Sequence, residues 1–177
     1  MRSYIDRLSR VRGYVLFGAL LIMVANYYAF RCFRDRSMST EDNKALVRRY
    51  IEVVWNKRNA AALDEFVAPN YKRYPSPTVT PLTCEGQRER ITGFHAAFPD
   101  IHFTVEDLFA EGDRVLFRAR MRGTHQGLFP FQHVAPTGKQ VTVSVIDVVR
   151  IEHGRFAEHW GGPDYLDLLQ QLGLRFP

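Results

Sequence analysis

The stretch KQVTVSVIDVVRIE, Lys139 to Glu152, decides the fold that the sequence predicts. Its alternation predicts a β-strand, because a strand sends successive side chains to opposite faces of a sheet. One face carries five aliphatic residues and one carboxylate, namely Val141, Val143, Val145, Asp147, Val149 and Ile151. Burying an unpaired carboxylate is costly, and a raised pKa relieves the cost. Asp147 is therefore either a structural residue, in a slipped register or bonded to backbone donors, or the acid/base group of a ligand cavity.

A second strand of the same kind is predicted from Arg114 to Gly123. One face is apolar and the other is basic: Val115, Phe117, Ala119 and Met121 alternate with Arg114, Arg118, Arg120 and Arg122. The apolar row continues to His125, so His125 and Asp147 are expected to meet in one cavity if the two strands are neighbours. The arginine face is either solvated or covered by a helix or a second subunit, and a homodimer through the sheet is one expectation.

The remaining segments predict an α+β fold with an antiparallel sheet, because helices come first and strands joined by short turns follow. Helices are expected at about 41–56, 60–67, 85–97 and 164–172, and further strands at 101–109 and 156–160. A Pro-rich loop at 70–81 is expected to wrap the surface or to cover the mouth of a cavity. Ser39 or Thr40 is placed to cap the first helix. Tyr50 and Trp55 on that helix are core aromatics or pocket lining. In strand 156–160, alternation with Phe156 predicts that Trp160 faces inward.

The excess charge lies at the N-terminus. The net charge is +5, and residues 1–37 carry all of it, with seven arginines and two aspartates. Residues 38–177 have no net charge, so nucleic-acid binding by this part has little support. The sequence lacks a Gly-rich phosphate loop, HExxH, CxxC and a metal-ligand spacing of histidines, so we expect no metal and no cofactor.

The apolar run GYVLFGALLIMVANYYAF at 13–30 predicts an N-terminal hydrophobic helix in a separate segment, 1–37, ahead of a domain at 38–177. It is an uncleaved membrane anchor or a signal peptide, and the bulky exit favours the anchor. Met38 begins a natural domain start. The protein is therefore expected to be membrane-anchored if translation begins at Met1, and cytoplasmic if it begins at Met38.

Four segments together resemble the SnoaL-like polyketide cyclase (ester cyclase) family: ALVRRYIEVVWNKRNAAALDEFVAPNY, FHAAFPDIHFTVEDLFAEGDRVLFRARMRGTHQG, PTGKQVTVSVIDVVRIEHGRFAEHW and PDYLDLLQQLG. The resemblance implies a nuclear-transport-factor-two-like fold, a cone-shaped curved antiparallel sheet with helices around an apolar cavity. It matches Asp147 to the family's acid/base aspartate, His125 to the GTHxG histidine, and His159 and Trp160 to its EHW residues. Many relatives carry a histidine soon after PNY, whereas this sequence has Lys72, Arg73 and Tyr74.

The resulting hypothesis is a cofactor-free intramolecular aldol cyclisation of a small hydrophobic carbonyl compound. Asp147, with a raised pKa, removes a proton next to a carbonyl and returns it to the new alkoxide, and His125 orients Asp147 or the reacting oxygen. The pocket is expected to include Trp160, His159, Phe117, Met121, Tyr50 and Trp55. A non-catalytic module that binds a hydrophobic ligand is the first alternative. A hydrolase is the second, with Asp164 and Arg150 as further groups, although Arg150 has the wrong strand parity for the cavity.

Overall fold

The computed structural model describes residues 39–129 and 133–175. The expected hydrophobic helix at 13–30 and the segment 1–37 that contains it lie outside these residues. Within the described ranges, no helix has both the length and the apolar character that a membrane span requires.

The first predicted helix forms and begins where the sequence indicates. The α-helix α2 spans Thr40–Tyr50 and continues as a wider π-helical turn, η1, over Ile51–Asn56. The Ser39 side chain accepts a hydrogen bond from the Asp42 backbone N–H, and the Asp42 carboxylate accepts one from the Ser39 backbone N–H. This capping box satisfies N–H groups that have no partner inside the helix.

Four further helical segments follow, with bounds close to those predicted. They are η2 at Ala60–Ala62, α3 at Leu63–Phe66, α4 at Cys84–Ala97 and α5 at Tyr165–Leu172. Gly173 ends α5 in the left-handed conformation, at a φ of 103°, as glycine commonly does after a helix.

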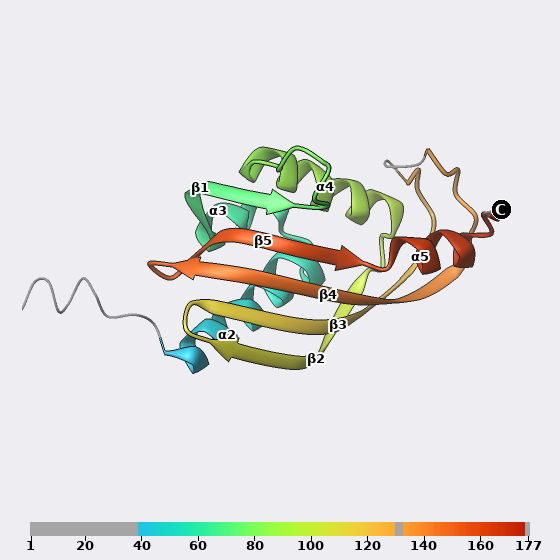
Figure 1. The fold of residues 1–177 in the computed structure, drawn as a ribbon. Coiled ribbons are helices and arrows are strands. Elements are labelled where there is room, and N and C mark those ends of the chain that lie inside the picture. Colours follow the sequence, from blue (N-terminus) through green and yellow to red (C-terminus); the bar gives the residue numbers. More distant parts are fainter. Residues whose placement is uncertain (1–38, 130–132, 176–177) are drawn as a thin grey trace, which may run out of the picture. The chain divides into compact units, whose positions relative to one another are not determined.

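Five strands form one sheet in the order β1-β5-β4-β3-β2 (Figure 1). Their bounds are Val67–Tyr74 for β1, His102–Glu111 for β2, Arg114–Thr124 for β3, Gln140–Glu152 for β4 and Arg155–Pro163 for β5. From β2 to β5, each strand pairs antiparallel with the next one along the chain. β1 pairs parallel with β5.

The prediction of a wholly antiparallel sheet is wrong, because the sheet is mixed. β1 occupies residues that the sequence assigned to the end of a helix and to a surface loop. It lies at the edge of the sheet, and its register with β5 breaks between Val67 and Lys72. Pro69 falls inside that break, where a missing backbone N–H costs no ladder hydrogen bond.

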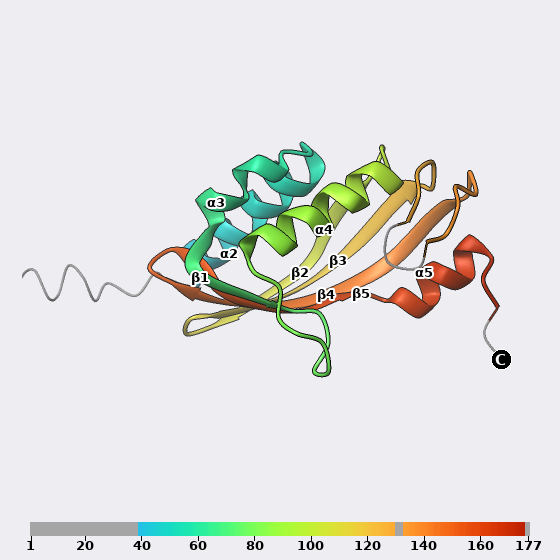
Figure 2. The same cartoon turned by 90° about the horizontal axis from the view of Figure 1, so that it is seen from above.

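The helices α2, α3 and α4 all lie on one side of the sheet, and β3 and β4 curve toward α4 (Figure 2). The apolar rows of β3 and β4 face these helices. Val115, Ala119, Met121, Val143 and Val149 are wholly buried. The alternation in both strands therefore predicted the buried face correctly.

The opposite face of the sheet carries the arginine row. Arg118 pairs with Glu106 and Asp107 of β2, and Arg120 also pairs with Glu106. Leu116 and Ile146 are exposed on this face. A homodimer through it stays a prediction.

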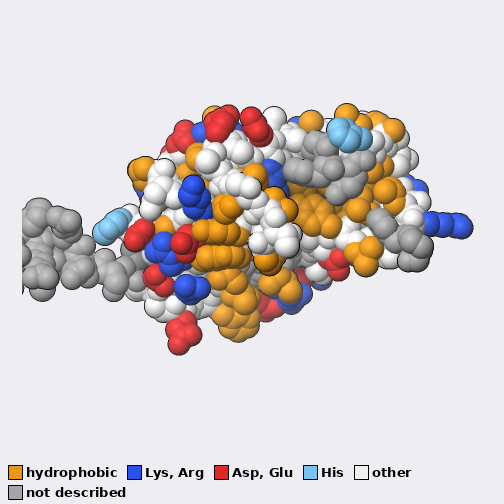
Figure 3. Space-filling view, turned by 45° about the horizontal axis from the view of Figure 1, so that its top comes forward, with side chains coloured by type: hydrophobic (Ala, Val, Ile, Leu, Met, Phe, Trp, Pro, Cys, Tyr) orange, Lys and Arg blue, Asp and Glu red, His pale blue; other side chains and the backbone are white. Residues whose placement is uncertain are grey.

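On the face of the molecule seen in Figure 3, hydrophobic side chains gather in the middle, with acidic and basic side chains around them.

Candidate active site

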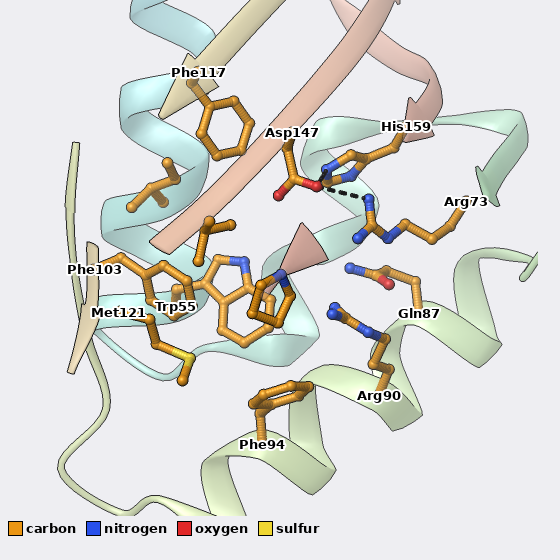
Figure 4. A pocket seen from close by; sticks show the side chains of 13 residues that line it. Trp55, Arg73, Gln87, Arg90, Phe94, Phe103, Phe117, Met121, Asp147 and His159 are labelled. Atoms are coloured by element: carbon orange, nitrogen blue, oxygen red, sulfur yellow. Dashed lines mark hydrogen bonds and ion pairs between the residues drawn. The ribbon is translucent and has the colours of Figure 1, made fainter. Parts of the chain in front are cut away.

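A pocket lies between α4 and the inner face of the sheet, and its two sides differ in chemistry (Figure 4). One side is apolar and includes Trp55, Phe103, Phe117 and Met121. The other side is polar. The full lining consists of Ile51, Trp55, Arg73, Gln87, Arg90, Phe94, Phe103, Phe117, Met121, Val145, Asp147, His159 and Pro163.

The pocket is narrow. Its cavity volume is about 20 Å³. Ligand pockets usually hold roughly 300–1,000 Å³. Side chains of the lining must therefore move before a ring-sized molecule enters.

Asp147 lies at the border between the two sides. It pairs with Phe117 of β3 across the sheet and is 7% exposed, so the slipped-register interpretation is wrong. Its Oδ1 accepts a hydrogen bond of 3.1 Å from Arg73 Nη1 and lies 3.4 Å from His159 Nε2. Its Oδ2 has no partner among the described residues and points into the pocket (Figure 4).

Arg73 reaches Asp147 across β5 because Gly161 leaves a gap. Arg73 is on β1 and Asp147 is on β4, and Gly161 pairs with Asp147 between them. Arg73 Nη2 donates to the Gly161 carbonyl oxygen at 2.8 Å. A Cβ on Gly161 would lie 2.1 Å from the Ile146 carbonyl oxygen and 2.9 Å from Asp147 Oδ1. At a φ of +103°, glycine is also the residue with the least strain.

The expectation of a raised Asp147 pKa is wrong. Burial raises the pKa of Asp147, but the Arg73 guanidinium, His159 and Arg90 together outweigh burial and hold that pKa well below its usual range. The aliphatic neighbours predicted the burial correctly. The sequence pattern did not show that a buried cation shares the site. A nearby positive charge favours the ionised carboxylate and therefore lowers its pKa.

His159 joins the same group of polar side chains. It is 2% exposed, and its Nδ1 lies 3.2 Å from the Tyr71 hydroxyl. Burial and then the charge of Arg73 lower the pKa of His159 to about 4, against the opposing effect of Asp147. The imidazole is therefore neutral at pH 7. The contact with Asp147 favours the proton on Nε2, so that Nδ1 accepts from Tyr71.

Trp160 does not face the pocket, so the prediction from alternation with Phe156 is wrong. Arg150 of β4 pairs with Glu158 of β5, and the next residue, Ile151, pairs with Phe156. Ala157 is therefore an extra residue in β5. This β-bulge shifts the side-chain parity by one. His159 consequently points inward, while Trp160 is half-buried outside the pocket and stacks on Tyr74 at 5.4 Å.

His125 does not meet Asp147. The two strands are neighbours, which the hypothesis required, but Phe117 is the residue opposite Asp147. His125 follows eight residues later, about 26 Å along a strand at roughly 3.3 Å per residue. It is fully buried against Phe98, and the Thr137 backbone N–H donates to its Nδ1 at 3.2 Å. Shared parity identified a shared face but not a shared position along it.

The other candidate residues are placed in or behind the pocket wall. Phe117, Met121 and Trp55 line it. Tyr50 lies behind the wall, where its hydroxyl accepts a hydrogen bond of 3.1 Å from Trp55 Nε1. Arg150 is on the outer side, bonded to Glu158 at 2.8 Å, as its parity indicated.

Sequence reasoning missed three polar lining residues, Arg73, Gln87 and Arg90. Arg73 gave no signal by itself, because the alternation of buried Tyr71 and Arg73 with exposed Lys72 shows only in the structure. For Gln87 and Arg90 a signal was present in their helical spacing. Gln87 and Arg90 lie one turn apart on α4, as residues three apart do, next to the buried Phe94. Among the described residues, no group of three or more His, Cys, Asp or Glu side chains is arranged to hold a metal.

A model of the SnoaL-like polyketide cyclase family matches residues 44–172. The chain belongs to this family. The match includes every element from α2 to α5 except the first helical residues. No protein of curated function gives a significant match.

Several solved structures share the fold. A candidate polyketide cyclase from Acidithiobacillus ferrooxidans is 32% identical, with 76% of this chain and 97% of that chain covered and a TM-score of 0.65. IdmH from Streptomyces antibioticus, also a candidate polyketide cyclase, is 31% identical, with 75% and 99% covered and a TM-score of 0.64. AclR from Streptomyces galilaeus, a candidate hydroxylase, is 29% identical, with 78% and 100% covered and a TM-score of 0.68.

Proposed function

We propose that the protein is a cofactor-free cyclase that closes a ring in a small hydrophobic carbonyl compound by intramolecular aldol addition. The observation that carries this proposal is the arrangement of Asp147: one carboxylate oxygen is fixed by Arg73 and approached by His159, and the other is unpartnered and faces an apolar pocket. An ionised, positioned carboxylate is a general base. The cyclase names of family members support the same reaction class.

In the proposed reaction, Asp147 Oδ2 takes a proton from the carbon next to a carbonyl group. The electron pair of that C–H bond moves to the carbonyl oxygen and forms an enolate. The enolate carbon then attacks a second carbonyl carbon, and the resulting alkoxide takes the proton back from Asp147. Proton and charge therefore balance within the pocket without a second reactant.

The low pKa of Asp147 restricts the substrate. A carboxylate stabilised by Arg73 is a weak base, so its substrate needs an acidic C–H bond, such as one between two carbonyl groups. His159 acts as a positioning residue, because both its ring nitrogens face protein groups.

The test is proton abstraction alone, which does not require the natural substrate. A simple aryl 1,3-diketone is incubated in D2O with the full chain, and loss of the C–H signal is followed by NMR. We expect exchange faster than in buffer, and a reduction of roughly 100-fold or more in Asp147→Asn. Asp113→Asn, at an exposed carboxylate that lies 4.0 Å from Arg150, is the control. Exchange at the full rate in Asp147→Asn contradicts the proposal.

A ligand-binding module of the same fold is the second candidate, and the weak basicity of Asp147 favours it. It predicts ligand affinity that survives Asp147→Asn and no catalysed exchange with any diketone. A hydrolase has less support, because Asp147 is the one carboxylate among the described lining residues.

A further inference from the structure

The polar side of the pocket carries more positive than negative charge. Arg73 and Arg90 are cations, Asp147 is the single carboxylate of the described lining, and His159 is neutral. Arg73 and Arg90 are 1% and 7% exposed, so solvent screens neither of them well. Buried charges are normally matched by opposite charge. One positive charge on this side of the pocket therefore has no carboxylate to balance it.

Hydrogen-bonding capacity is also unused at this place. Arg73 Nε and both amide atoms of Gln87 are buried and make no hydrogen bond of normal geometry among the described residues. Gln87 is fully buried and its amide lies beside the Tyr50 hydroxyl. Buried polar groups without a hydrogen bond are rare in folded proteins. Figure 4 shows Gln87 between Arg73 and Arg90, directed into the pocket.

The two guanidinium groups lie near each other on the polar side of the pocket. A Cβ on Gly162 would lie 3.5 Å from Arg73 Nη2 and 4.0 Å from Arg90 Nη2, so these nitrogens are at most 7.5 Å apart, the sum of the two distances. Arg90 Nη2 makes one bond, of 2.9 Å, to the Tyr165 hydroxyl. Charge-assisted hydrogen bonds of about 2.8 Å from each side reach a single carboxylate placed between the two groups.

We propose that the pocket takes an anionic substrate: an apolar carbonyl compound whose carboxylate is bound by Arg73, Arg90 and Gln87. This inference deepens the proposed function and rests on the pocket being its substrate site. A carboxylate has one negative charge and matches the one unbalanced positive charge, whereas a phosphate dianion exceeds it. The apolar body of the ligand then lies toward Phe94 and Phe117, on the side of the pocket where Asp147 Oδ2 is unpartnered.

The test compares an anionic probe with its neutral methyl ester. Binding of 2-naphthoate and of methyl 2-naphthoate to the full chain is measured by titration calorimetry at pH 7. We expect the carboxylate to bind at least tenfold more tightly than the ester. Arg90→Gln is expected to remove this preference, while Arg48→Gln, which changes the net charge equally at an exposed helical position, preserves it. Equal affinity for the two probes, or equal loss in both variants, overturns the inference.

A second variant separates binding from folding. Gln87→Leu removes an amide without a hydrogen bond of normal geometry, so the variant is expected to fold and to bind 2-naphthoate severalfold more weakly. Unchanged affinity in Gln87→Leu counts against the inference. The diketone exchange assay is independent of both probes: exchange that depends on Asp147 without a carboxylate preference leaves the proposed function standing and removes only this inference.

Discussion

Arg73 and Asp147 form a buried ion pair that joins the edge strand β1 to the inner strand β4 across β5. Arg73 Nη1 and Asp147 Oδ1 lie 3.1 Å apart, and the two side chains are 1% and 9% exposed. The pair fixes the charge of the carboxylate that faces the pocket. It also ties the strand that the sequence pattern missed to the strand that the pattern predicted best.

Arg73→Met is expected to destabilise the fold by about 3–5 kcal/mol, because it leaves the buried Asp147 carboxylate without its cation. The pKa of Asp147 rises in this variant. Urea unfolding at pH 7 gives the free energy. The double variant Arg73→Met/Asp147→Asn is expected to recover most of the loss, since no buried charge is then left unpaired. An Arg73→Met protein as stable as the wild type contradicts a buried ion pair.

The stability of the fold is expected to depend on pH through His159. Its folded pKa of about 4 lies below the usual 6.5, so the unfolded chain binds more protons between these two values. Stability is therefore fully present above about pH 6.5 and is lost as pH falls toward 4, by on the order of 3 kcal/mol. Urea unfolding as a function of pH measures this slope. His159→Asn should flatten it, and an unchanged slope would show that other groups cause it.

Gly161→Ala is expected to destabilise the fold by roughly 3 kcal/mol or more, because the new methyl group meets the Ile146 carbonyl oxygen and Asp147 at a strained φ. Gly112→Ala is the matched control. Gly112 also has a positive φ, of +56°, but a Cβ there meets no atom within 4 Å, so only about 1–2 kcal/mol of backbone strain remains. Equal losses in the two variants would mean that close approach at Gly161 is unimportant.

Gln87→Leu is expected to raise the melting temperature by about 3 °C, since removing an unsatisfied buried amide recovers roughly 1 kcal/mol. Differential scanning calorimetry measures the change. The same variant is expected to bind an organic carboxylate more weakly, so stability and binding move in opposite directions. A lower melting temperature would assign Gln87 to the packing of the core instead.

Alternation predicted β3 and β4 with the correct buried face, because each strand has one apolar and one polar face along its whole length. Asp147 was identified for the same reason: one carboxylate in an aliphatic row is a local contradiction. Its partners were not, because Arg73 belongs to an edge strand with prolines nearby and few apolar residues. A buried arginine has no distinctive pattern in one sequence, and its burial depends on a countercharge 74 residues away.

Trp160 and His125 show the limit of parity arguments. Side-chain parity holds only while the strand register is continuous. The bulge at Ala157 interrupts the register just before His159. For His125, parity was correct but the distance along the strand was not considered. Both errors concern how strands align, which depends on pairing rather than on the composition of either strand.

The bulge at Ala157 has a consequence for how this pocket can be redesigned. One inserted residue in β5 decides whether an imidazole or an indole is presented to Asp147. Deleting Ala157 would exchange the two side chains without changing the identity of either, turning a polar wall into an aromatic one. The reactivity of the pocket is thus encoded partly by the number of residues in a strand, a property that substitutions at the lining positions leave untouched.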